Sequence, residues 1–210
     1  MFFRKEAITG KMMSAKGGKA VPYIALLDSD GKVVAPYKGP HRVEAFDRAR
    51  GFAERLVALR AVKTPTPAQQ LESLMAKVEL SLVTPSKARK ALESIPTLTK
   101  VQRSAANRTI SDAQVLRAWY ASQPRTKRDR IKLGKRYQAM FKDGCRPKRK
   151  AAAQAFYMLI CEHAEAIGSA TIYRASLTEL RAWLVEQGAD ADRVLRPFEA
   201  RCKRLEARKK

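Results

Sequence analysis

The chain has 210 residues, of which 45% are apolar, and it carries 43 Lys or Arg against 20 Asp or Glu, a formal net charge of +23. This length suffices for one ordinary hydrophobic core or two small ones. A sequence pI of about 10.4 is typical of proteins that bind a polyanion, most commonly nucleic acid. The sequence contains no apolar stretch near the roughly 18 residues of a membrane span, so we expect no membrane partner.

The first sixty residues predict a basic arm followed by a small α+β unit. Residues 1–20 combine glycines with basic side chains and show no periodicity, which predicts a flexible basic arm. Within the next unit, 21–62, two β-rich runs flank the turn sequence Asp28-Ser29-Asp30-Gly31 and predict a β-hairpin. Apolar residues at helical spacing then predict a helix from about Val43 to Ala61. We assign Asp28 and Asp30 to turn formation rather than to catalysis.

The hairpin carries two resemblances. The run VPYIALLDSDGKVV at 21–34 resembles the distal hairpin of thioredoxin-like domains, in which a proline precedes a strand that ends in Asp-x-Asp-Gly-Lys. The Cys-x-x-Cys of that family is absent, so this resemblance does not imply redox activity. The hairpin and the helix after it are also similar to the small three-stranded DNA-binding modules of phage integrases. That resemblance implies that the following side chains would contact DNA: Tyr23, Lys32, Tyr37 and Lys38.

The region 63–108 is expected to be a set of linker helices broken by prolines. Pro65 and Pro67 disfavour helix in the residues before them and mark the clearest boundary in the chain. Short helices are predicted at 69–82 and at 85–94, where Thr84 supplies the cap. A third helix is expected to begin at Thr97 or Thr99 and to fade near Asn107.

The region 109–210 is predicted to be a helical, basic, nucleic-acid-binding domain. Helices are expected from Ser111 and Asp112 to Ser122, from Thr126 to Lys142, at 149–167 and at 176–187, with a final helix containing Pro197. We expect one shared bundle core from the following residues: Phe156, Leu159, Ile160, Leu180, Trp183, Leu184, Phe198 and Leu205. The fold class is therefore mainly α, with a small N-terminal β-hairpin-and-helix unit before a multi-helix C-terminal bundle.

The strongest functional signal is a basic segment at 123–150, which holds twelve Lys or Arg and only two acids. On a helical wheel, Arg128, Lys132, Lys135 and Arg136 share one arc, opposite Leu133, Tyr137, Met140 and Phe141. Phosphates would neutralise this surface and release counterions. The candidate nucleic-acid-binding residues are Arg125, Lys127, Arg128, Lys132, Lys135, Arg136, Arg146, Lys148, Arg149 and Lys150.

Several alternatives remain open at this stage. The basic helix could be the second helix of a helix-turn-helix, or it could be an ordinary solvated face. Trp119, Tyr120 and Tyr137 could stack on unpaired bases, although their helical spacing beside leucines favours the core. The favoured function is that of a nucleic-acid-binding protein of a phage, plasmid or bacterium. One alternative is a structural virion, scaffold or ribonucleoprotein component that neutralises nucleic acid. The other is a protein that binds an acidic partner protein. The sequence does not distinguish DNA from RNA.

Neither an enzyme nor a cofactor is predicted. Gly18-Lys19 is followed by Ala20 rather than by the Ser or Thr of a phosphate loop, and no hydrolase or metalloprotease motif occurs. A nuclease built from scattered acids stays an alternative. The three cysteines have no close pair and no zinc-finger spacing with His163, so we expect reduced, buried thiols, no metal, and a cytoplasmic location in association with a nucleoid, virion or ribonucleoprotein.

Overall fold

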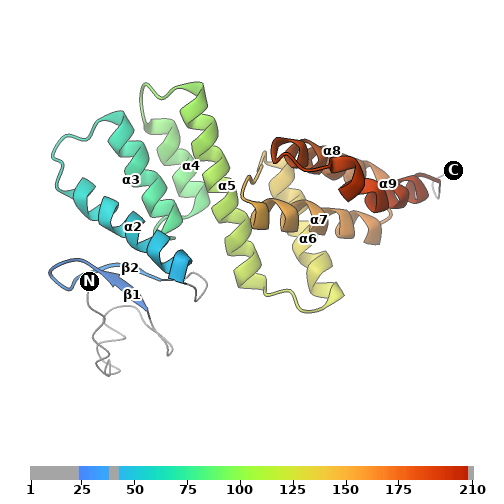
Figure 1. Ribbon diagram of the computed structural model, residues 1–210, viewed down its shortest axis with the longest axis horizontal. Coiled ribbons are helices and arrows are strands. Elements are labelled where there is room, and N and C mark those ends of the chain that lie inside the picture. Colours follow the sequence, from blue (N-terminus) through green and yellow to red (C-terminus); the bar gives the residue numbers. More distant parts are fainter. Residues whose placement is uncertain (1–23, 38–42, 208–210) are drawn as a thin grey trace. The chain divides into compact units, whose positions relative to one another are not determined.

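The computed structural model describes residues 24–37 and 43–207, whose arrangement within each part of the chain is shown in Figure 1. These residues form eight helices and a two-stranded antiparallel hairpin. The predicted fold class is confirmed. The chain divides into two compact units, Met1–Ala106 and Asn107–Lys210. The predicted basic arm at 1–20 lies outside the described residues, as do Tyr23 and Lys38.

The hairpin of the first unit pairs β1 (Ala25–Leu27) with β2 (Val33–Pro36), and its turn follows the predicted chemistry. The Asp28 carboxylate accepts hydrogen bonds from the backbone N–H groups of Asp30 and Lys32, at 3.1 and 2.8 Å. Gly31 completes the turn at φ +73°, a conformation that costs glycine little. Asp28 therefore has a structural role, as expected from the sequence.

Three helices complete most of the first unit: α2 (Val43–Arg60), α3 (Pro67–Glu79) and α4 (Pro85–Ser94). Helix α2 packs against β2 and α3, and α3 packs against α4. The apolar faces meet in one small core, whose buried members are Leu26, Val34, Ala35, Ala53, Leu56, Ala76 and Leu80. The helices expected as linkers between residues 63 and 108 thus pack with the N-terminal hairpin and helix.

Threonine side chains begin consecutive helices of this unit. Thr66 accepts the backbone N–H of the third residue of α3, and Thr84 does the same for α4, as predicted. Thr99 begins the next helix, because its hydroxyl accepts the N–H of Gln102 at 3.2 Å while the Gln102 side chain accepts the N–H of Thr99 at 2.9 Å. This reciprocal pair is a capping box.

Helix α5 (Lys100–Ser122) runs unbroken across the boundary between the two units, which corrects the predicted interruption between Asn107 and Ser111. The prediction took Ser111 and Asp112 for the cap of a new helix. Both side chains are buried inside the continuous helix, and both bind backbone N–H groups much later in the chain. Their polar chemistry therefore serves a tertiary contact.

The second unit continues with α6 (Lys127–Lys142), α7 (Lys150–Ala166), α8 (Ala170–Glu186) and α9 (Ala191–Ala207), each packed against the next (Figure 1). Helix α8 begins six residues before the predicted start at Ser176. The hydroxyl of Ser176 is buried and donates to the carbonyl of Tyr157 at 3.0 Å, so this serine belongs to the packed interior of α8. Helix α9 contains Pro197, as predicted for the final helix.

The predicted bundle core is confirmed. Seven of its eight predicted members are buried in a single cluster, and the eighth, Phe198, is half-buried against that cluster. Trp183 is 7% exposed, and its indole N–H donates to the carbonyl of Lys148 at 2.9 Å. Burial of this indole therefore leaves no unsatisfied donor.

The cysteines are buried, as predicted, and His163 is buried as well. Burial raises the pKa of the Cys161 thiol to about 12 and lowers the pKa of His163, which the neighbouring Lys135 lowers further. Within residues 24–37 and 43–207, no group of three or more His, Cys, Asp or Glu is placed to hold a metal ion. None of the described helices combines the length and the apolar character required to cross a membrane.

Candidate nucleic-acid interface

Helix α6 starts where Thr126 and Asp129 form a capping box. The backbone N–H of Asp129 donates to the Thr126 hydroxyl oxygen at 3.2 Å, and the Asp129 carboxylate accepts the Thr126 hydroxyl at 2.7 Å. The carboxylate also accepts the backbone N–H of Thr126 at 3.2 Å. The two hydrogen bonds that Thr126 donates to the carboxylate, the hydroxyl bond first, hold the pKa of Asp129 below its usual value of 3.8. The single acid in the first turn of this basic helix is therefore used for helix initiation.

One face of α6 docks closely on α7 through Gly134. A Cβ atom at this position would lie 2.1 Å from the carbonyl oxygen of Leu159 and 2.8 Å from the Cβ of His163. Only a residue without a side chain permits this approach of the two helices. Gly134 is thus the crossing point of α6 and α7.

Aromatic packing secures the same face of α6. Tyr137 is fully buried, and its hydroxyl donates to the carbonyl of Val115 at 3.0 Å. Its ring lies 5.1 Å from that of Phe156, and burial raises the pKa of the phenol. Tyr137 therefore belongs to the core and has no free face for stacking on a base.

The opposite face of α6 carries the predicted basic arc, and all four of its members are exposed: Arg128, Lys132, Lys135 and Arg136. None of the four forms an ion pair with an acid of the described residues. Three of them, with Gln138, Ala139 and Lys142, line a shallow hollow of about 470 Å³. Lys142 lies seven residues after Lys135, two helical turns further on the same face, so the helical period could have added it to the predicted site.

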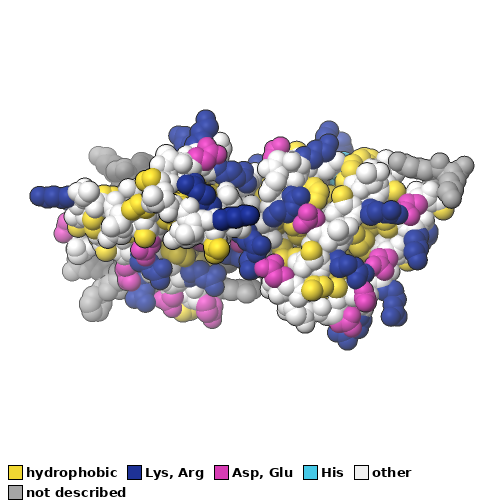
Figure 2. Space-filling model, turned by 90° about the horizontal axis from the view of Figure 1, so that it is seen from above, with side chains coloured by type: hydrophobic (Ala, Val, Ile, Leu, Met, Phe, Trp, Pro, Cys, Tyr) yellow, Lys and Arg dark blue, Asp and Glu magenta, His cyan; other side chains and the backbone are white. Residues whose placement is uncertain are grey.

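Several basic residues on the other helices of this unit pair with acids of neighbouring helices. Ion pairs bridge α8 and α9 through Arg174–Glu206 and Arg181–Glu199, and Arg201 of α9 pairs with Glu165 of α7 at 3.8 Å. Figure 2 shows acidic side chains interspersed among the basic ones on the face drawn there. These three cations are neutralised locally, whereas within residues 24–37 and 43–207 no ion pair is found for the exposed arc of α6.

Three other predicted site residues lie in the connection between α6 and α7 and make extensive contacts within the protein. Arg146 stacks over the ring of Phe141, with its guanidinium carbon 4.0 Å from the ring centroid, and pairs with Glu179 at 3.1 Å. Lys148 pairs with Glu186 at 2.9 Å and, with Arg108, lowers the pKa of that carboxyl. These two residues therefore help to hold the bundle together.

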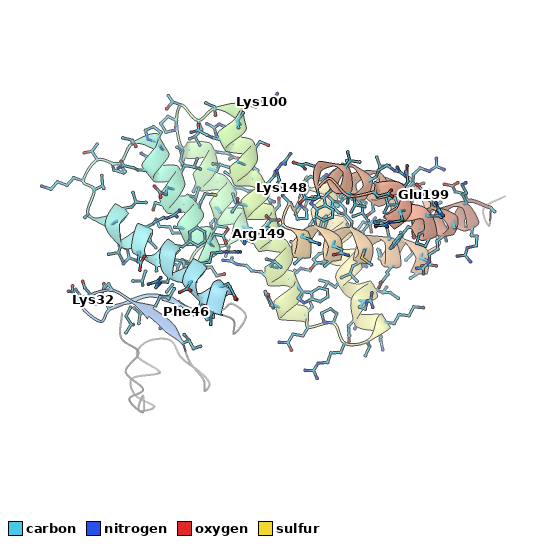
Figure 3. All side chains as sticks on the ribbon, viewed as in Figure 1. Lys32, Phe46, Lys100, Lys148, Arg149 and Glu199 are labelled. Atoms are coloured by element: carbon cyan, nitrogen blue, oxygen red, sulfur yellow. The ribbon has the colours of Figure 1, made fainter. Side chains whose placement is uncertain are left out.

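Asp112 of α5 supplies the cap that α7 lacks in its own sequence. The side chain of Arg149, at the capping position, makes no capping hydrogen bond. Instead, Asp112 Oδ1 accepts the backbone N–H groups of Lys148 and Arg149, at 2.7 and 3.0 Å, and its Oδ2 lies 3.8 Å from Arg149 Nε. Figure 3 labels Lys148 and Arg149 at the start of α7. The third residue of this connection is therefore also tied to the fold.

The remaining predicted site residues are exposed: Arg125 and Lys127 at the start of α6, and Lys150 at the start of α7. None of them pairs with an acid in the part of the chain that the structure describes. Lys150 lies at the positive end of the dipole of α7, and a bound anion would reduce the repulsion between these like charges. The predicted set thus separates into exposed, unpaired cations and the three cations of the connection.

Comparison with known proteins gives no further identification. No family model, no curated protein and no solved structure matches this chain. The two resemblances of the N-terminal hairpin therefore receive no support beyond the residues that suggested them.

Proposed function

We propose that this chain is a non-enzymatic nucleic-acid-binding protein of phage, plasmid or bacterial DNA or RNA handling, and that the exposed arc of α6 lies along the phosphate backbone. The observation that carries the proposal is the contrast in pairing. Several other cations of the second unit, among them Arg174, Arg181 and Arg201, form ion pairs across helices. The arc instead gathers four exposed cations on one helix face, with no ion pair in the described residues: Arg128, Lys132, Lys135 and Arg136. Such a concentration of unpaired charge favours an external polyanion.

The dimensions of α6 suit this role. At about 1.5 Å per residue, the cations between Arg128 and Lys142 extend over about 21 Å, enough to follow several phosphates. The Gly134 crossing and the buried Tyr137 fix the helix on α7, so the arc is held on a rigid support. Each contact with duplex DNA releases counterions and adds about 0.9 to the slope of log affinity against log salt.

A second candidate is a structural component that neutralises nucleic acid through its total charge of +23, without a defined surface. A binder of an acidic protein is a third. The first two candidates differ in whether the position of the charges matters. Binding through a defined surface depends on the cations of α6, whereas binding as a general polycation depends only on the net charge.

The test compares two triple variants that lose the same charge. Lys132, Lys135 and Arg136 are changed to Gln in one variant, and Arg196, Lys203 and Arg204 of α9, also exposed and unpaired among the described residues, are changed to Gln in the other. Binding to oligonucleotides is measured by fluorescence anisotropy over a salt series. The α6 variant should lose affinity and about 2–3 units of salt slope, while the α9 variant stays close to the parent.

Two outcomes would contradict the proposal. Equal losses in the two variants would indicate a general polycation. Absence of binding in the parent protein, with capture of an acidic protein instead, would support the third candidate.

A further inference from the structure

A second hollow of the C-terminal unit, of about 260 Å³, lies where α5, α6 and α7 meet. We call it the Trp119 groove. Its lining includes Trp119 of α5, Arg130 of α6, and Ala151, Gln154, Ala155 and Met158 of α7. These residues come from separate helices of one compact unit, so the groove is a product of the fold rather than of one helix surface.

The lining of this groove contains two planar groups, the indole of Trp119 and the guanidinium of Arg130. Trp119 is half-buried and packs against the bundle core, which restrains its indole. Arg130 is held by an ion pair with Glu162 of α7. Indole and guanidinium planes are the groups on which proteins stack unpaired bases. The two alanines of the lining carry only a methyl group and fill little of the groove.

Gln154 adds hydrogen-bonding capacity to the lining of the groove. Its side chain is exposed, and its amide makes no hydrogen bond to another described residue. A primary amide offers both a donor and an acceptor, which suits the edge of a base. A groove that served only an apolar peptide side chain would gain nothing from this amide.

Unpaired cations flank the groove on two helices. Lys127 lies one helical turn before Arg130 on α6, and Lys150 lies one turn before Gln154 on α7. Both lysines are exposed and unpaired among the described residues. A strand with its base in the groove would therefore bring its phosphates toward positive charge on either side. This charge complementarity favours a nucleic-acid strand over an apolar segment of protein.

We propose that the Trp119 groove binds an unpaired base, so that the substrate class is single-stranded nucleic acid, or a loop, rather than a continuous duplex. The base would stack on the indole of Trp119, while the phosphates of the same strand contact the flanking lysines, Lys127 and Lys150. This inference rests on the proposed function, because it assumes that the charged surface binds nucleic acid.

The test uses the full chain with oligothymidylate, oligouridylate and a DNA duplex of equal phosphate number. The chain has two tryptophans, and Trp183 is buried in the core, so quenching by a bound strand reports Trp119. Both single strands, or one of them, should quench the fluorescence, and the duplex should not. Trp119→Leu should weaken single-strand binding about ten-fold, in the range measured for base–aromatic stacking, and leave duplex binding unchanged.

Two further variants control for folding and position. Ala151→Leu fills the groove from an exposed position, so it should reduce single-strand binding without lowering the melting temperature. Tyr120→Leu removes the neighbouring aromatic, which is 50% exposed and outside the groove, and should bind like the parent. Single-strand affinity unchanged in Ala151→Leu, or lost equally in Tyr120→Leu, would overturn the assignment of the groove.

The two proposals fail in different ways. If the parent protein binds no oligonucleotide at all, the proposed function itself is wrong. If it binds the duplex as tightly as the single strands and Trp119 is not quenched, the basic arc remains the site and the base groove is wrong. If an acidic peptide fills the groove and quenches Trp119 while oligonucleotides do not, the occupant is protein.

Discussion

Substitution of Gly134 by alanine tests the close docking of the basic helix on its support. The new Cβ would stand 2.1 Å from the carbonyl oxygen of Leu159, whereas carbon–oxygen contacts are normally about 3.3 Å or longer. Helices α6 and α7 would have to separate by about 1 Å at their crossing. Overpacking of this kind costs about 1–3 kcal/mol, and the backbone atom involved cannot rotate away, which favours the upper end of the range.

The helix propensity of alanine opposes this loss. Alanine is about 1 kcal/mol more favourable than glycine inside a helix, so we expect a net destabilisation of about 2 kcal/mol. In a unit of roughly 100 residues, this corresponds to a fall in melting temperature of about 10 °C. Thermal unfolding followed by tryptophan fluorescence is a suitable assay, because both Trp119 and Trp183 lie in the affected unit.

Gly51, inside α2, provides the matched control. A Cβ at this position would meet no atom within 4 Å, so Gly51→Ala should gain the propensity term alone, about 0.5–1 kcal/mol of added stability, measured by circular dichroism. The same substitution should thus have opposite signs at the two positions. A Gly134→Ala protein as stable as the parent would refute the assigned crossing of α6 and α7.

Three further predictions concern polar groups and thiols. Asp112→Ala should destabilise the protein by about 2 kcal/mol or more in chemical denaturation, because the backbone N–H groups of Lys148 and Arg149 would lose the buried Asp112 carboxylate as their acceptor, and a neutral effect would contradict the capping role. Thr126→Val should raise the depressed pKa of Asp129 toward 3.8 in an NMR titration. Since the folded pKa is the lower one, the stabilisation by this carboxylate is present above pH 3.8 and is lost as the pH falls through the folded value. Finally, Cys161, whose pKa burial raises to about 12, and the other two thiols should resist a thiol-specific reagent at pH 8 until the protein is denatured, and prompt reaction would contradict their burial.

Elements determined by local chemistry could be predicted from the sequence. The Asp28 turn and the caps at Thr84 and Thr126 each need partners only a few residues away, and each is found as expected. The sequence also predicted which face of α6 is buried and which is exposed, because its apolar and basic residues lie on opposite sides of a helical wheel. The bundle core followed in the same way from helical periodicity.

Features that depend on distant partners could not be predicted. Ser111 and Asp112 have the chemistry of a helix cap, but the helix that Asp112 caps is α7, more than thirty residues later. Arg146 and Lys148 looked like part of the binding surface, because the acids that pair with them lie in α8. The Trp119 groove likewise needs three helices to be placed before it exists.

The unbroken course of α5 has a practical meaning for dissecting the protein. The division of the chain into units falls after Ala106, in the middle of a helix, so a fragment that started there would expose a fresh helix end with four unsatisfied N–H groups. Thr99 and Gln102, in contrast, form a natural capping box at the start of the same helix. The better construction boundary for the C-terminal fragment is therefore Thr99, seven residues before the last residue of the first unit, because there the severed end carries its own hydrogen-bonding partners.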